Sequence, residues 1–198
     1  RLFRMRQAGR VGPLGWLLRH YLFIRVPILR PDRFLDATVD AVRWLGSRAA
    51  LAVYVVVGLL GLVLVSSRIE TYVSTFPHFF NWQGAAAYAV AIVAIKGIHE
   101  FAHAYTAKAF GVNVRSMGVA FLVFWPVPFS DVTDAWRLRS RRERFLIGFA
   151  GIGAELAIAA FALVGWSVAP PGLFKSLCFI LSSVTLASTL LVNLNPAM

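Results

Sequence analysis

Four long apolar stretches limit this chain to folds that place helices in a lipid bilayer. The clearest, residues 49–67, contains no charged residue and is bracketed by Arg48 and Arg68. Its length matches the roughly 20 residues that an α-helix needs to cross a bilayer. The chain is also 59% hydrophobic, with a mean hydropathy of +0.70, which is too apolar for a soluble domain. We therefore predict an all-α polytopic membrane protein with four transmembrane helices, over residues 49–67, 84–110, 145–169 and 172–194.

The sequence also predicts the structure of two regions outside these spans. Residues 1–48 form a basic juxtamembrane segment, in which apolar residues recur at helical spacing from Asp32 onward. This pattern indicates an amphipathic helix at the membrane surface, or equally a small packed cytoplasmic subdomain. The apolar run 119–127 is too short to span, so we expect a re-entrant or strand-like segment between the second and third spans. Residues 49–198 then make up the membrane core.

The net charge of +11 would suit a nucleic-acid-binding protein, but its distribution indicates a membrane topology instead. Segments 1–48 and 111–144 carry ten and six basic residues, whereas segment 68–83 and the turn near Lys175 carry one each. Basic residues collect in cytoplasmic loops. We therefore expect no nucleic-acid partner, a cytoplasmic N-terminus and an exterior segment 68–83.

Residues 99–103 read His-Glu-Phe-Ala-His and lie within the second predicted span. Positions i and i+4 share one face of a helix, so His99 and His103 can offer two imidazoles to one zinc ion. Glu100 can serve as the general base that acts on a zinc-bound water. Ionisable groups are costly inside a membrane span. We therefore favour a metal site over purely structural hydrogen bonds for the two histidines.

Other polar residues are predicted at a similar depth. His99 lies about 22 Å along the second span from its outer end, and Glu155 about 15 Å into the third from the inner end. Glu155 is a candidate partner of a ligand histidine, of Lys96 or of a polar group on another helix. We expect Lys96 to snorkel away from the site. Asn195, at the end of the fourth span, is a candidate substrate or transition-state contact, or a helix cap before Pro196.

Asp131 and Asp134 follow the short apolar run and precede a cluster of arginines at 137–144. They are candidates for a substitute metal ligand. The simpler interpretation for these residues is a cap that stabilises the loop or a salt bridge to the arginine cluster.

The order of four motifs resembles the site-2 protease family of intramembrane zinc metalloproteases. The motifs are the His99–His103 segment, Ser130-Asp131-Val-Thr-Asp134-Ala-Trp136, Gly151-Ile-Gly-Ala-Glu155 and Asn193-Leu-Asn195-Pro196. They look most like the branch of peptide zinc metalloproteases associated with bacterial peptide maturation and export. The resemblance implies Zn²⁺ bound by His99 and His103, and Glu100 as catalytic base. It also implies a third ligand, an aspartate in an Asn-Pro-x-x-x-Asp-Gly pattern, which we expect beyond Met198.

From this resemblance we expect a membrane-embedded peptide or protein as substrate and the bacterial inner membrane as location. A peptide exporter or a larger membrane complex is a candidate partner. A catalytically inactive scaffold that keeps the fold is the main alternative. An unrelated metal transporter ranks last, because Glu155 is the one further acidic or histidine residue within the predicted spans.

Overall fold

The computed structural model describes residues 23–122 and 125–189, and three of its helices are long and apolar enough to cross a membrane. They are α3 (Arg48–Ser66), α5 (Trp82–Ala109) and α6 (Arg141–Val168). The fourth apolar helix, α7 (Leu173–Ser188), is shorter, at 16 residues. The remainder of the predicted fourth span lies beyond the described residues. The described residues therefore contain three candidate membrane-spanning helices, and the prediction of four is not confirmed.

Polar caps set the starts of the long helices. The side-chain oxygens of Ser47, Asn81 and Ser140 each accept a hydrogen bond from the backbone N–H three residues later, at the starts of α3, α5 and α6. Such caps satisfy N–H groups that have no partner within the helix. Gly111 stops α5, with a φ of +76° that glycine adopts without strain. Local sequence thus fixes where the helix that carries the histidines begins and ends.

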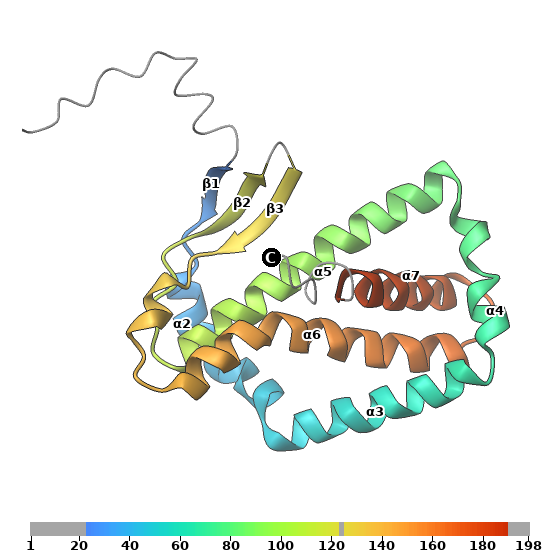
Figure 1. Ribbon diagram of the computed structural model, residues 1–198, viewed down its shortest axis with the longest axis horizontal. Coiled ribbons are helices and arrows are strands. Elements are labelled where there is room, and N and C mark those ends of the chain that lie inside the picture. Colours follow the sequence, from blue (N-terminus) through green and yellow to red (C-terminus); the bar gives the residue numbers. More distant parts are fainter. Residues whose placement is uncertain (1–22, 123–124, 190–198) are drawn as a thin grey trace, which may run out of the picture.

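Helix α6 lies at the centre of the bundle and packs against α3, α5 and α7 (Figure 1). Small residues bring α3 close to it. A Cβ added at Gly61 would lie 2.9 Å from the Leu163 Cβ, and one added at Gly58 would lie 3.5 Å from the Ala160 Cβ. Close backbone approach through small residues is typical of helix packing in lipid. This packing holds α3 closely against α6.

A three-stranded antiparallel sheet, in the order β1-β2-β3, corrects the all-α prediction. Strand β1 (Phe23–Leu29) comes from the segment that we interpreted as juxtamembrane. Strands β2 (Met117–Leu122) and β3 (Trp125–Ser130) form a hairpin where the sequence predicted a re-entrant or strand-like segment. The strand alternative is therefore correct there. The sequence analysis did not predict β1, because a single short strand in an arginine-rich stretch shows little regular alternation of polar and apolar residues.

Prolines lie on both edge strands of this sheet, Pro27 on β1 and Pro126 and Pro128 on β3. Proline has no N–H, so it is confined to edges and bulges. The Asp131 N–H donates to the Ser116 carbonyl at 2.8 Å, just beyond the strand pairing. Along an antiparallel strand, backbone nitrogens point alternately toward the partner strand and away from it. Pro126 and Pro128 lie an odd number of residues before Asp131, so their nitrogens point away from β2, to the free edge. That edge therefore lacks N–H donors at both positions.

The sheet lies at the same end of the bundle as α2 (Asp32–Val42), whereas α4 (Ile69–Val73) lies at the other end (Figure 1). The short helical turns η1 (Arg43–Gly46) and η3 (Thr133–Arg137) belong to the sheet end, and η2 (Phe76–Phe79) to the α4 end. The fully buried Leu35 packs α2 into a core with Ala104 of α5 and Ile147 of α6. This core holds the C-terminal half of α5 beside the start of α6.

Candidate metal centre

His99 and His103 face α6 from one side of α5, with their Nε2 atoms 3.0 Å apart. Each ring is held through its other nitrogen. The His103 Nδ1 lies 2.6 Å from the Ile147 carbonyl oxygen, and the His99 Nδ1 lies 2.8 Å from Glu155 Oε1. The predicted i, i+4 pair is thus brought together and fixed in orientation.

These partners decide which nitrogen of each ring carries a proton. The Ile147 carbonyl only accepts hydrogen bonds, so the His103 Nδ1 must donate. The His99 Nδ1 forms no hydrogen bond of normal geometry within the described residues. A proton on this atom is nevertheless favoured, because a lone pair there would face the Glu155 carboxylate at 2.8 Å. In the neutral imidazole the Nε2 then carries a lone pair. Two lone pairs therefore converge at 3.0 Å, where they repel each other unless a cation or proton lies between them. This tautomer pattern is the usual one for histidines that bind metals.

Helix α6 presents a matching face to the two rings. Ile147, Gly151 and Glu155 are spaced four residues apart and so share one side of the helix. A Cβ added at Gly151 would collide with the His99 Nε2 and would lie 2.5 Å from the His103 Nε2. Because it has no side chain, Gly151 lets both rings lie close to the α6 backbone, and any side chain there would occupy the position beside both Nε2 atoms.

The pair fits one edge of a tetrahedral zinc site. With Zn–N bonds of about 2.0–2.1 Å, two ligand nitrogens in such a site lie about 3.3 Å apart. The observed separation of 3.0 Å needs only a small opening of the two rings. Within residues 23–122 and 125–189, no cluster of three or more His, Cys, Asp or Glu residues could hold a metal ion. The described residues therefore supply two converging nitrogen donors.

Glu155 is completely buried and forms a polar cluster with three neighbours. Its Oε1 lies 2.8 Å from both the His99 Nδ1 and the Lys96 Nζ, and its Oε2 accepts from the Thr189 hydroxyl at 2.9 Å. The three alternatives that the sequence left open for Glu155, a ligand histidine, Lys96 and a polar group on another element, are thus all present together. The snorkelling prediction for Lys96 was wrong, because a buried carboxylate on the adjacent helix attracts its ammonium group more strongly than the distant membrane surface.

Glu100 lies on α5 beside the histidines, and its Oε2 accepts a hydrogen bond of 2.7 Å from the Ser130 hydroxyl. Ser130 is the last residue of β3, so this bond joins the hairpin to α5. Sequence reasoning assigned no role to Ser130. The available signal was its place at the start of the Ser130-Asp131 motif, directly after the short apolar run.

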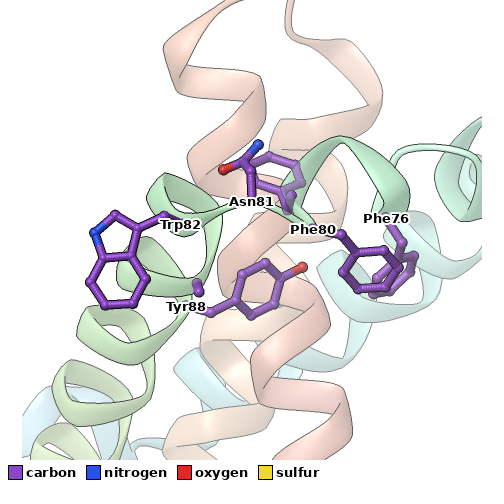
Figure 2. Close-up of a pocket in the computed structure, with 7 residues that line it drawn as sticks. Phe76, Phe80, Asn81, Trp82 and Tyr88 are labelled. Carbon is purple, nitrogen blue, oxygen red and sulfur yellow. The ribbon is translucent and has the colours of Figure 1, made fainter.

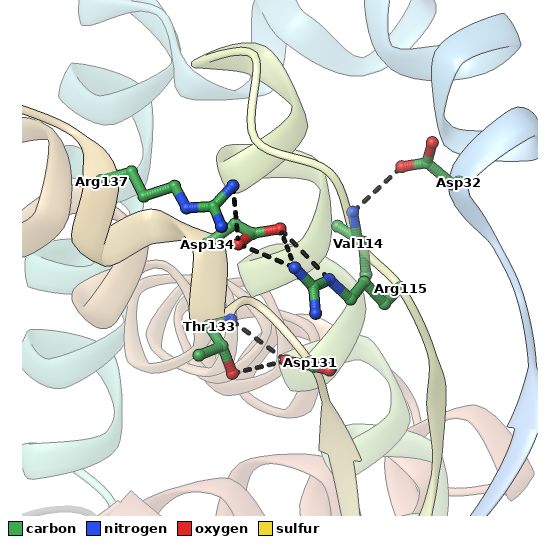
Figure 3. A network of polar contacts seen from close by, with 7 residues as sticks. All are labelled: Asp32, Val114, Arg115, Asp131, Thr133, Asp134 and Arg137. Carbon is green, nitrogen blue, oxygen red and sulfur yellow. Dashed lines mark hydrogen bonds and ion pairs between the residues drawn. The ribbon is translucent and has the colours of Figure 1, made fainter.

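Asp131 and Asp134 both form polar contacts in and around the loop that follows β3 (Figure 3). Asp131 accepts from the Thr133 hydroxyl at 2.6 Å, and this bond lowers the pKa of its carboxyl group. Asp134 pairs with Arg115 and with Arg137 of the arginine cluster. These contacts match the loop-cap and salt-bridge interpretations rather than the substitute-ligand one.

A large pocket of about 560 Å³ lies at the other end of α5, away from the histidines (Figure 2). It is apolar and is lined by Phe76, Phe79, Phe80, Asn81, Trp82, Ala85 and Tyr88. Trp82 precedes His99 by 17 residues, or about 25 Å along the helix. This pocket is therefore separate from the candidate metal centre. Asn195, the remaining predicted site residue, lies outside the described residues.

The comparison with known families agrees with these features. The sequence model of Peptidase family M50, the family of site-2 proteases, matches residues 87–195, which is more than half of the chain. The matched region contains the histidine pair, the hairpin and α6. No curated protein and no solved structure matches the chain.

Proposed function

The chain belongs to peptidase family M50, and we propose that it is an intramembrane zinc metallopeptidase. The observation that carries this proposal is the convergence of the His99 and His103 Nε2 lone pairs beside Gly151. The Ile147 carbonyl accepts from the His103 Nδ1, and the Glu155 carboxylate lies 2.8 Å from the His99 Nδ1, so both rings favour the form that binds a metal.

Each residue of the site has a role in peptide-bond hydrolysis. His99 and His103 would hold the zinc ion, and Glu155 and the Ile147 carbonyl would keep their rings in the ligating tautomer. When bound, zinc supplies a Lewis acid and a nucleophilic hydroxide at neutral pH. The Glu100 carboxylate accepts a proton from the attacking water and delivers it to the nitrogen of the leaving amine.

We infer a membrane-embedded peptide or protein as substrate, because three helices of the described chain are apolar enough to span the bilayer. The sheet end, with the loop between α5 and α6, is assigned to the cytoplasm. The sixteen basic residues of segments 1–48 and 111–144, against two in the exterior segments, support this orientation. The bacterial inner membrane as location and a peptide exporter as partner remain parts of this proposal that rest on the motif resemblance.

Metal analysis and a cleavage assay together test the proposal. The full-length protein, with any residues that precede Arg1 or follow Met198, should contain about one zinc per chain. His99→Ala and His103→Ala should lose it. Glu100→Gln should keep zinc and hydrolyse candidate peptides from its own cell envelope about 10²- to 10⁴-fold more slowly. A zinc-loaded parent that cleaved no such peptide would favour the inactive scaffold instead.

A further inference from the structure

The hydrogen bond between Ser130 and Glu100 gives Ser130 a place beside the proposed catalytic base. It is 2.7 Å long and joins two side chains 30 residues apart in the chain. An ionised carboxylate has no proton to give, so the hydroxyl donates and Oε2 accepts. Bonds of this charge-assisted kind are short and stronger than neutral ones. Ser130 therefore restrains the carboxylate that we assign as the base.

The backbone around Ser130 is itself fixed. Its carbonyl accepts from the Val132 N–H at 3.1 Å, and the next residue, Asp131, donates to the Ser116 carbonyl at 2.8 Å. Across the ladder Ser130 lies opposite Met117, which is buried in the core that joins α2, α5 and α6. The hydroxyl is thus presented to Glu100 from a rigid strand end, as a group that orients a catalytic side chain must be.

Ser130 also lines a recess of about 230 Å³ between β1, β3 and η3, together with Arg25, Phe129, Asp131, Val132, Thr133 and Trp136. Within this recess the Thr133 hydroxyl donates to Asp131. The recess therefore offers a second hydroxyl as a matched control for Ser130.

We propose that Ser130 is a positioning residue for the Glu100 base. By engaging Oε2, it fixes the side-chain torsions of Glu100 and leaves Oε1 as the oxygen that exchanges the proton. Without this bond the carboxylate samples other rotamers, and displacements of about 1 Å are enough to cost on the order of 100-fold in rate. This inference rests on the proposed function, since it assumes that Glu100 is the base.

The first arm of the test needs no catalysis. Thermal unfolding midpoints in detergent should be measured for Ser130→Ala, Glu100→Ala and the double variant. The shifts of the single variants should be non-additive, with Ser130→Ala costing little once Glu100 is absent. Thr133→Ala should instead add its full shift to that of Glu100→Ala. Additive shifts for the Ser130 pair would overturn the inference, whatever the activity.

The second arm measures turnover on the full-length protein. Ser130→Ala should lower kcat by roughly 10- to 100-fold with little change in KM or zinc content, whereas Ser130→Thr should restore most of the rate. Parental kcat in Ser130→Ala, or an equal loss in Ser130→Thr, would contradict a positioning role. If the first arm shows coupling but the parent cleaves no peptide, the proposed function fails while the pairing itself stands.

Discussion

Gly151 provides the sharpest structural prediction, because a single methyl group there would enter the space beside both histidines. The added Cβ of Gly151→Ala would collide with the His99 Nε2 and lie 2.5 Å from the His103 Nε2. Ordinary contact needs a separation of about 3.5 Å, so each ring must retreat by about 1 Å. The rings cannot retreat freely, since the His103 Nδ1 is hydrogen-bonded to Ile147 and the His99 Nδ1 lies 2.8 Å from Glu155, both on α6.

The expected effect follows from this displacement. Overpacking of a tight contact costs about 1–3 kcal/mol of unfolding free energy. Zinc affinity should also fall, by at least ~10-fold, because disturbing the groups that orient ligand histidines typically lowers metal affinity 10- to 100-fold. Chelator competition on the purified protein in detergent measures the affinity, and thermal unfolding measures the stability.

Gly148→Ala is the matched control, one turn earlier on α6. Its added Cβ would meet nothing within 4 Å. It should bind zinc as the parent does and be slightly more stable, since alanine favours a helix by up to about 1 kcal/mol over glycine. If folded Gly151→Ala bound zinc as tightly as Gly148→Ala, the space beside the Nε2 atoms would not be the metal site.

Further predictions concern the groups around the pair, the sheet end and the topology. Glu155→Ala should cost about 3 kcal/mol of stability and weaken zinc binding 10- to 100-fold, because it removes the carboxylate that holds His99 and pairs with Lys96; unchanged chelator competition would refute this. The hydrogen bond from Lys108 lowers the pKa of Asp32, so its stabilising contribution is present above the unfolded pKa of about 3.9 and is lost as the pH falls through the lower folded pKa. Acid titration of the unfolding midpoint should therefore show a loss below about pH 4 that is smaller in Asp32→Asn, and identical curves would contradict it. In a background without Cys178, a cysteine at Ser140 should react with a membrane-impermeant maleimide only when the cytoplasmic face is opened, and labelling of intact cells would reverse the topology.

The histidine pair could be predicted from the sequence because its geometry is local. Two residues four apart on a helix share a face whatever the rest of the fold does. The depth of Glu155 was also accessible, since helix rise and span boundaries place it near His99 without knowledge of packing. Which partners Glu155 contacts could not be predicted from the sequence. Lys96 was expected to leave the site, and only the juxtaposition of α5 and α6 shows that Glu155 reaches both side chains.

The contribution of the sheet could not be predicted, because it depends on contacts between residues that are far apart in the chain. Strand β1 pairs with β2 across 88 to 99 residues of chain, and its sequence is interrupted by arginine and proline. Nothing local indicates that Ser130 at the end of β3 will meet Glu100 on a helix. The role of Gly151 was equally hidden, because a glycine in an apolar helix is most simply a packing residue until the neighbouring rings are placed.

X-ray absorption at the zinc edge on the zinc-loaded, full-length protein would show whether the histidine pair binds the metal. At least two imidazole nitrogens should lie about 2.0–2.1 Å from the zinc, with their ring-scattering signature. This signature should disappear in the His99→Ala, His103→Ala double variant and persist in Glu100→Gln. A spectrum without imidazole ligands in the parent, or one unchanged in the double variant, would show that the converging Nε2 atoms do not hold the metal.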